Sequence, residues 1–286
     1  MATLRELRTR VASISNIQRV TNAMQMVAAA KMRRAQESIE AARPYSQQLD
    51  RVLRQLHQSI NSNEQPLFKQ RPVERVTVVA VASDRGLCGG FNANLCRQVQ
   101  TELNGYADAQ VELVTVGRKS RDFFSNRGHT IARHHADVFA SLEFVRAVDI
   151  AQDLTRSFIA GETDRVVLCY SEFVSVASQM PVVHQLLPIV PEDGGETGEG
   201  ADYAFEPSPE ELLETLVPRQ VNFQVWRALL ESNAGFFAAQ MTAMDNATKN
   251  AGDMIEELTR EMNKERQASI TLELMDIIGG AEAVAT

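Results

Sequence analysis

The feature that most constrains the fold is a stretch at residues 209–280 that contains a single internal proline, Pro218. From residue 237 onward, apolar or small residues recur at alternating spacings of four and three, the heptad pattern of a coiled coil. These residues are Phe237, Met241, Met244, Thr248, Ala251, Ile255, Leu258 and Met262. One helix over this stretch would rise about 1.5 Å per residue and reach roughly 100 Å, too far for one domain to cover.

The end of this predicted helix is marked by glycine. After a slip in phase, the apolar pattern resumes at Ile270, Leu274, Ile277 and Ala281. Gly279 and Gly280 follow the last large apolar residue, where glycine commonly ends a helix. The alternative is two or three shorter helices broken near Gly235 and Gly252.

A coiled-coil seam needs a partner, and residues 3–60 supply a second helical pattern. Heptad spacing links Leu4, Leu7, Val11 and Ile14, and after a shift it links Ile17, Val20, Met24 and Val27. Pro44 should kink or end this helix. Because the apolar stripe continues beyond it, we expect a kink. The two helices could pair in antiparallel fashion if a compact middle domain brings the chain ends together.

The middle of the chain alternates strand-like and helix-like segments. After a polar linker at residues 61–72, strands are expected at 76–82, 112–116, 165–170 and 182–189, and helices at 92–103, 118–126 and 144–159. Residues 191–207 are expected to form an exposed acidic loop. The predicted fold is therefore α/β: a long coiled coil of the N- and C-terminal helices with a central, mostly parallel, Rossmann-like domain. Its parts would be residues 1–60, 73–206 and 209–280.

The charge is unevenly distributed along the chain. The net charge is −8, but residues 1–60 hold ten Lys or Arg against four Asp or Glu. This basic arm suggests a negatively charged partner, although a solvated helix face explains it equally simply. No signal peptide is evident, and the longest apolar run, residues 78–82, is too short to span a bilayer. We therefore expect a soluble or peripheral protein.

The sequence offers no convincing metal, disulfide or cofactor site. Cys88, Cys96 and Cys169 form no C-x-x-C pair, and the adjacent His134 and His135 would not converge on one ion. The loop at residues 86–90 follows a strand and precedes a helix, where α/β folds bind phosphates. Its glycines fit neither G-x-x-x-x-G-K-[ST] nor G-x-G-x-x-G, the two glycine-rich motifs that bind phosphates. A tight turn is the simpler interpretation, so no cofactor and no catalytic residue are expected.

Three stretches together resemble the gamma subunit of F-type ATP synthases. They lie at residues 21–31, 83–92 and 270–283 and occur in the family's order. The resemblance covers the whole chain, and a coiled coil of the chain ends around a parallel-sheet domain is also the family's architecture.

The resemblance implies a rotor without a catalytic site of its own. In the family, the terminal helices form a shaft inside a hexamer of alternating alpha and beta subunits. The α/β domain sits with the epsilon subunit on the ring of c subunits. Proton flow turns ring and shaft, and the shaft drives the beta subunits through ATP synthesis. The implied location is peripheral, on the cytoplasmic side of a bacterial inner membrane, which this chain would contact only through the ring.

Carried over by position, several residues would contact the beta subunits. The segment that would meet a beta catch loop contains Arg266, Gln267 and Thr271. The residues that would face the acidic C-terminal lobe of beta are Lys31, Arg33, Arg34, Leu87 and Cys88, with Met24 near the same lobe. The shaft tip, residues 272–278, has apolar residues on more than one face, which suits an apolar sleeve.

The chain departs from the family pattern at two positions. Phe236 and Gln240 stand where the family usually has Glu and Arg, four residues apart and able to pair on a helix. Phe236 should instead add apolar area beside Phe237 and tighten the shaft. The plant-type insertion with a regulatory cysteine pair is missing here, so thiol switching is not expected.

Two other functions are compatible with parts of the sequence. A nucleotide-binding α/β protein with coiled-coil arms would use the loop at residues 86–90, and the isolated chain would then bind ATP. A nucleic-acid-binding coiled coil would use the basic arm. Tyr45 is the only aromatic residue in residues 1–60 and the whole chain is acidic, so nucleic acid is not an expected partner.

Overall fold

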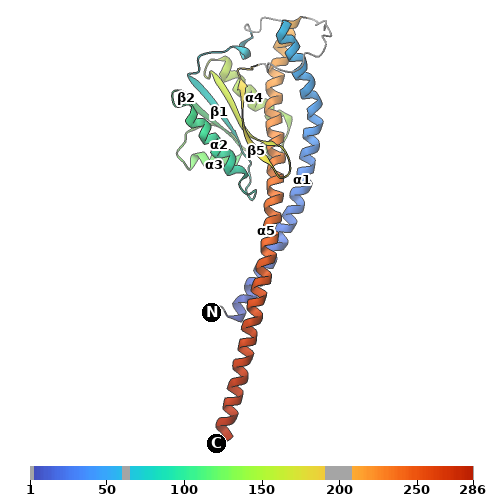
Figure 1. The fold of residues 1–286 in the computed structure, drawn as a ribbon. Coiled ribbons are helices and arrows are strands. Elements are labelled where there is room, and N and C mark those ends of the chain that lie inside the picture. Colours follow the sequence, from blue (N-terminus) through green and yellow to red (C-terminus); the bar gives the residue numbers. More distant parts are fainter. Residues whose placement is uncertain (1–2, 60–64, 191–207, 286) are drawn as a thin grey trace. The chain divides into compact units, whose positions relative to one another are not determined.

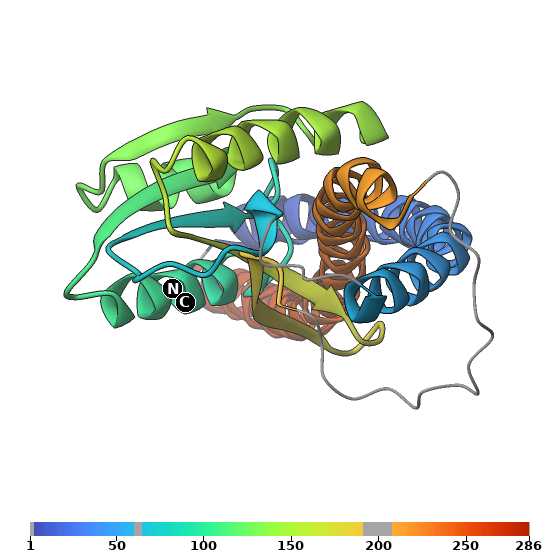
Figure 2. The same ribbon diagram turned by 90° about the horizontal axis from the view of Figure 1, so that it is seen from above.

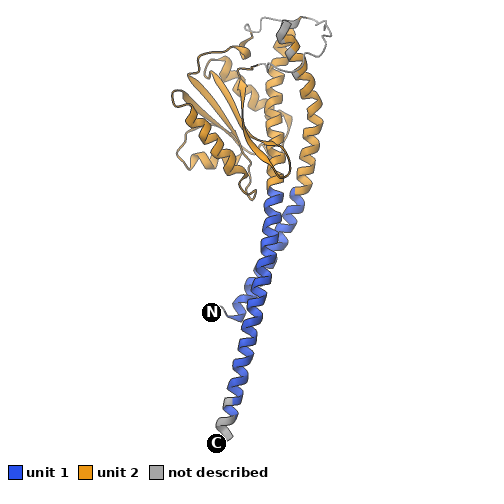
Figure 3. Cartoon of the chain, in the orientation of Figure 1, with its two compact units in different colours: residues 1–28, 240–286 blue, residues 29–239 orange. Residues whose placement is uncertain are grey.

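The computed structural model describes residues 3–59, 65–190 and 208–285. Its elements are α1 (Leu4–Ser59), η2 (Pro66–Phe68), β1 (Arg75–Val81), α2 (Phe91–Gly105), β2 (Gln110–Val116), α3 (Arg118–Ser125), β3 (Ile131–His135), α4 (Phe144–Ile159), β4 (Arg165–Phe173), β5 (Gln179–Leu187) and α5 (Pro209–Ala285) (Figure 1). The chain divides into two compact units, residues 1–28 with 240–286 and residues 29–239 (Figure 3). Helices α1 and α5 each contribute a segment to both units. The expected acidic loop at 191–207 lies outside the described residues.

The larger unit, residues 29–239, is built on a five-stranded sheet in the order β3-β2-β1-β4-β5. Strand β1 pairs in parallel with β2 and β4, β2 pairs in parallel with β3, and β5 is antiparallel to β4. The expected mostly parallel sheet is confirmed. The sequence did not predict β3, because Arg133, His134 and His135 give this edge strand a polar composition that is typical of a loop.

Both faces of this sheet are covered, which explains the uninterrupted apolar run of β1. On one face, β1 contacts α2 and α3 through Val76, Val78, Ala80, Leu95, Val99 and Phe124. The other face packs against α4, η2 and the α5 segment of this unit through Val79, Val81, Ile150, Leu154, Phe158, Val221 and Leu229. Figure 2 shows α2 and α4 on opposite sides of the sheet. Leu67 and Phe68 are buried in η2, so part of the predicted linker belongs to the core.

In the smaller unit, α1 and α5 form an antiparallel pair, since Thr21 lies beside Thr248 and Gln25 beside Asp245. The predicted seam of α5 is confirmed up to Met262, whereas its expected continuation at Ile270, Leu274, Ile277 and Ala281 is exposed. Its positions from 241 to 262 are buried or half-buried, with Met244 and Ala251 the most enclosed.

The predicted seam of α1 is only partly right. Leu7 is buried, and Val11 and Ile14 are half-buried as expected. The expected shift to Ile17, Val20 and Val27 does not occur, because these three side chains are exposed. The heptad continues without a shift through Gln18, Thr21, Gln25 and Ala28. Polar side chains thus occupy the contact where the sequence predicted apolar ones.

Helix α5 is continuous, so the alternative of two or three shorter helices is wrong. A Cβ on Gly235 would lie 3.1 Å from Phe91 Cε2, and one on Gly252 would lie 3.1 Å from Gln18 Nε2. These glycines permit close packing within their units and do not break the helix. The predicted stop at Gly279–Gly280 is also wrong, since α5 runs to Ala285. Helix α1 likewise runs through Pro44.

Phe236 lies beside Phe237 as predicted, but its other aromatic contact is with the α/β domain. It is buried against Phe91, with ring centroids 6.2 Å apart, and contacts Cys88 in a small apolar cluster. Its neighbour Phe237 lies 5.2 Å away, as ring centroids, and is only partly buried. Phe236 therefore joins α5 to the start of α2 and to the preceding loop. Its apolar area serves the α/β domain and not the pairing of the two long helices.

We expect Gly235→Leu to destabilise the chain, because a larger side chain would push against the Phe91 ring and the neighbouring Gln179 side chain. Overpacking of this kind costs about 1–3 kcal/mol. Chemical denaturation measures the free energy of unfolding. The matched control is Gly280→Leu, where nothing lies within 4 Å of the added Cβ and little change is expected. Equal destabilisation by both variants would contradict a packing role for Gly235.

Candidate partner-binding surfaces

The end of α5 extends past its pairing partner in the smaller unit. Continuing the pairing of Thr21 with Thr248 brings Leu4, the first residue of α1, level with Glu265. Every residue from Arg266 to Ile278 is exposed. The exposed apolar side chains there are Ile270, Leu272, Leu274, Met275, Ile277 and Ile278. This length of amphipathic helix has no covering element within the described residues, which is the property of an interaction surface.

The predicted catch-loop residues lie at the start of this exposed segment. Thr271 Oγ1 donates a hydrogen bond to Gln267 O at 2.9 Å, so that hydroxyl is satisfied within its own helix. In the described part of the chain, the side chains of Arg266 and Gln267 have no hydrogen-bond or ion-pair partner. Both are exposed and available to another protein.

The basic residues of α1 that were predicted to contact a beta subunit belong to the larger unit. Lys31, Arg33 and Arg34 are all exposed. Lys31 Nζ lies 5.4 Å from the centroid of the Phe237 ring, and Arg33 forms an exposed 3.9 Å ion pair with Glu37. Contacts of these kinds contribute little at exposed positions, about 0–1 kcal/mol each. The three cations are therefore held loosely and remain accessible.

A hollow of about 220 Å³ lies beside Lys31 and Arg34. Its remaining lining comes from Ala35, Ser38, Leu142, Trp226, Leu230, Asn233 and Phe237. Basic and aromatic side chains thus border one depression on the larger unit. Sequence reasoning identified the cations but not the aromatic side chains beside them, because Trp226 and Phe237 lie about two hundred positions away in the chain.

The loop after β1 separates two residues that the sequence grouped together. Leu87 is 63% exposed and has a φ of 62°, whereas Cys88 is 3% exposed. Asn92 holds the loop closed: its Oδ1 accepts hydrogen bonds from Ser83 N and Oγ, and its Nδ2 donates to Arg85 O. Asn92 Nδ2 also lies 3.2 Å from Cys88 Sγ. Of the two predicted contact residues, only Leu87 presents its side chain to solvent.

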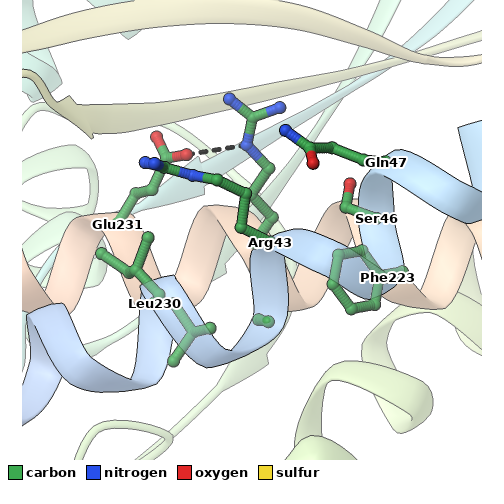
Figure 4. A pocket seen from close by; sticks show the side chains of 9 residues that line it. Arg43, Ser46, Gln47, Phe223, Leu230 and Glu231 are labelled. Atoms are coloured by element: carbon green, nitrogen blue, oxygen red, sulfur yellow. Dashed lines mark hydrogen bonds and ion pairs between the residues drawn. The ribbon is translucent and has the colours of Figure 1, made fainter.

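A second cavity of about 220 Å³ lies between α1 and α5 in the larger unit, and Arg227 and Glu231 of α5 are among the residues that line it (Figure 4). Arg227 Nε donates to Glu231 Oε1 at 2.7 Å, and Arg227 also lies 3.8 Å from Glu172 of β4. Burial raises the pKa of Glu231, although the hydrogen bond from Arg227 opposes that shift. Together with a 3.3 Å hydrogen bond from Ser171 N to Ser232 Oγ, these contacts attach α5 to β4. Sequence reasoning missed this polar attachment.

Metal-binding and membrane-spanning features are missing from the part of the chain that the structure describes. Within it, no three His, Cys, Asp or Glu side chains gather into a group able to hold a metal ion. None of the helices there combines the length and the apolar character needed to cross a bilayer. In the described residues, the candidate functional features are therefore the exposed end of α5, the basic residues of α1 and the loop after β1.

Comparison with known proteins identifies the family. A family profile described as ATP synthase matches residues 3–284. The ATP synthase gamma chain of Chlorobium phaeobacteroides (strain BS1) is 45% identical over 292 residues and is matched over 99% of both chains. That of Anaeromyxobacter sp. (strain Fw109-5) is 47% identical over 290 residues, covering 99% of this chain and 100% of that one. The chain belongs to the ATP synthase gamma-chain family.

Solved structures support the same assignment. A chain from the central stalk and c-ring of Tetrahymena thermophila mitochondrial ATP synthase is 25% identical, with a TM-score of 0.61, and the match covers 80% of this chain and 99% of that one. A chain of the Euglena gracilis mitochondrial ATP synthase matches with a TM-score of 0.69. The match covers 98% of this chain and 94% of that one. Its 18% identity shows the common fold alone. The family inferred from three short motifs is confirmed.

Gamma chains are non-catalytic subunits of the ATP synthase complex. In this gamma chain the cysteine closest to a predicted contact surface is inward-facing. Burial raises the pKa of the Cys88 thiol, and it raises those of Cys96 and Cys169 to about 12. Because the thiolate is the reactive form, all three should be inert in the folded chain.

We expect the native chain to react with a maleimide at less than about one hundredth of the rate of the unfolded chain, because buried thiols react only after local opening. Counting labelled thiols by mass spectrometry at neutral pH measures this. Leu87→Cys places a thiol one residue before Cys88 and should label rapidly. If native Cys88 labels as fast as the thiol introduced by Leu87→Cys, the inward orientation of Cys88 is wrong.

Proposed function

We propose that this gamma chain is the rotating subunit of the central stalk, coupling proton movement through a membrane ring to ATP synthesis and hydrolysis in the catalytic hexamer. The single observation that carries the proposal is the end of α5, where exposed apolar and polar side chains continue beyond the level of Leu4, the first residue of α1. A helix of this kind requires a protein environment that the chain itself does not supply. A sleeve formed by six surrounding subunits would provide it.

The parts of the chain would divide this work. Residues 1–60 and 209–280 would form the shaft, and residues 73–206 the domain that sits with an epsilon subunit on the c-subunit ring. The membrane would be reached only through the ring, on the cytoplasmic side of the bacterial inner membrane. The two-sided packing of the sheet supports a rigid domain, since its core includes part of α5 itself. Torque applied to the domain would thereby act directly on that helix.

The contacts with beta subunits would fall in two groups. Arg266, Gln267 and Thr271 would engage a catch loop, with Arg266 and Gln267 providing the intermolecular hydrogen bonds because Thr271 is already satisfied within α5. Exposed cations at Lys31, Arg33 and Arg34 would face an acidic lobe, and Leu87 would contact the same lobe. Cys88 would support that loop from the inside, and Met24, which is half-buried, would contribute one edge of its side chain.

The isolated chain provides the first test. It should neither hydrolyse ATP nor bind it at equilibrium, but it should be required for coupled ATP synthesis in a reconstituted complex. Turnover proportional to the concentration of the isolated chain would overturn the proposal. Binding of ATP by the isolated chain would instead favour the nucleotide-binding alternative.

We expect Arg266→Ala to slow ATP turnover by up to about tenfold, if a charged hydrogen bond of about 1.5 kcal/mol favours one rotational state. Assembly should be nearly unaffected, since the hexamer would hold the shaft through many other contacts. Steady-state hydrolysis and gel filtration of the same complex measure the two effects. The matched control is Arg260→Ala, an exposed arginine of α5 that pairs with Glu256 within its own helix. Wild-type turnover in the Arg266 variant would refute its proposed role.

Replacing Lys31, Arg33 and Arg34 together by alanine should flatten the salt dependence of turnover. Screening by salt weakens exposed charge pairs, so a complex without these pairs has less to lose as ionic strength rises. The charge-matched control is the triple alanine variant of Arg5, Arg8 and Arg10, which are also exposed on α1. Identical salt profiles for the two triple variants and the wild type would mean that the cations are merely solvated.

A further inference from the structure

In the smaller unit, helix α1 carries two parallel stripes that could each face α5. One stripe is apolar and consists of Ile17, Val20, Met24 and Val27. The other is mostly polar and consists of Gln18, Thr21, Gln25 and Ala28. The stripes are offset by one residue, so a rotation of α1 by about 100° would exchange them. Hydrophobic burial alone would favour the apolar stripe at the contact.

The structure has the opposite arrangement. Val20 is 57% exposed, and Ile17 and Val27 are exposed to a similar degree. Thr21 is 9% exposed and Ala28 is fully buried. Leu7 and Ala28 are buried in this rotation, but between Ile14 and Ala28 no large apolar side chain of α1 is buried, so another interaction must favour the contact there.

Hydrogen bonds between the two helices supply that cause. Thr248 Oγ1 lies 2.8 Å from Thr21 Oγ1, and Gln25 Nε2 donates to Asp245 Oδ1 at 3.0 Å. Gln18 Nε2 reaches Thr248 O at 3.5 Å, in the space left by Gly252. The mostly polar stripe is thus the inner stripe of α1. Each of its polar residues faces a polar group at the same level along α5.

The surface of α5 that faces α1 includes the charged Asp245 beside the apolar Met244, and this carboxylate is unsuitable for contact with the apolar stripe. Asp245 also forms a 2.6 Å ion pair with Lys249, and this hydrogen bond lowers the pKa of the aspartate. Rotating Val20 and Ile17 into the contact would replace the Gln25 donor of this carboxylate by apolar atoms and leave Oδ1 without its hydrogen bond, which is unfavourable. A polar layer in a coiled coil characteristically specifies one alignment at some cost in stability.

We propose that the polar layer of Gln18, Thr21, Gln25, Asp245 and Thr248 determines the rotational phase and register of α1 on α5, and thereby keeps the apolar side chains of Ile17, Val20 and Val27 on the outside. The residues of the polar layer are specificity determinants of the helix pair. The inference concerns the fold of this chain and holds whether or not the proposed rotor function is correct.

The apolar stripe of Ile17, Val20, Met24 and Val27 is the outer stripe. The test measures how accessible this outer stripe is to a thiol reagent in the full chain. Val20→Cys introduces a thiol on that stripe, and the native cysteines are all buried, so maleimide labelling reports on position 20. Adding Asp245→Leu and Thr248→Leu makes the facing surface of α5 apolar. We expect α1 to rotate, and labelling at position 20 to slow about tenfold, as burial requires local opening before reaction. Ile270→Cys, on the exposed end of α5, is the control and should label at an unchanged rate.

A compensating pair of substitutions makes the test specific. Adding Thr21→Leu and Gln25→Leu to the same background makes the inner stripe apolar and continuous with Leu7, Val11 and Ile14. The original phase should then return, and labelling at position 20 should recover its original rate. If the Asp245 and Thr248 substitutions leave the labelling rate unchanged in a helical chain, the proposal is overturned.

A milder variant covers the case in which circular dichroism shows that the leucine variants do not fold. Gln25→Glu sets a second carboxylate against Asp245 and replaces an attraction by a repulsion. Labelling at Val20→Cys should slow in this variant. It should recover when Asp245→Asn is added, because the amide again gives the carboxylate a hydrogen-bond donor. A labelling rate that is the same as in the parent in both variants would equally reject a role for the polar layer.

Discussion

The structure depends on the pairing of two helices from opposite ends of the chain. Neither helix could be stable as a long isolated rod in water, because most helical stability in proteins comes from packing of an apolar face. In the larger unit, α5 also completes the core of the α/β sheet through residues such as Val221 and Leu229. In the smaller unit, the same helix has only α1 as a partner, and beyond Glu265 it has none among the described residues. Burial of α5 therefore decreases from the segment that packs on the sheet, to the segment paired with α1 alone, to the exposed end.

This decrease explains the distribution of polar interactions. Where α5 lies on the sheet, Glu231 and Ser232 are buried, and they bond to Arg227 and to β4, respectively. Within the helix pair, Gln25 and Asp245 are half-buried and bond across the contact. At the exposed end, Arg266 and Gln267 have no partner in the described chain. A rotor subunit has the same needs: rigid attachment at its domain, a specific helix pair, and unsatisfied groups where other subunits are met.

The departure from the family at Phe236 also follows from packing. A glutamate at this position would lie against Phe91 and Cys88, in an apolar cluster that offers it little compensation. Phenylalanine is well suited to that cluster, and Gly235 beside it lets the Phe91 ring approach α5 closely. The neighbouring loop then buries Cys88 and exposes Leu87. One substitution on α5 is thus linked to the shape of a surface that we propose contacts a beta subunit.

The sequence by itself determined the two long helices, the alternation of strands and helices, the family, and most of the seam of α5. These features depend on local spacing and composition, which can be read along the chain. Only the tertiary structure decided that β3 is a strand, that α5 continues past Gly280, that Cys88 faces inward, and which stripe of α1 meets α5. Periodicity reveals that stripes exist but does not choose between two stripes one residue apart. The proposed polar layer makes that choice through Asp245 and Thr248, which lie more than two hundred positions away in the chain and hydrogen-bond with Gln25 and Thr21.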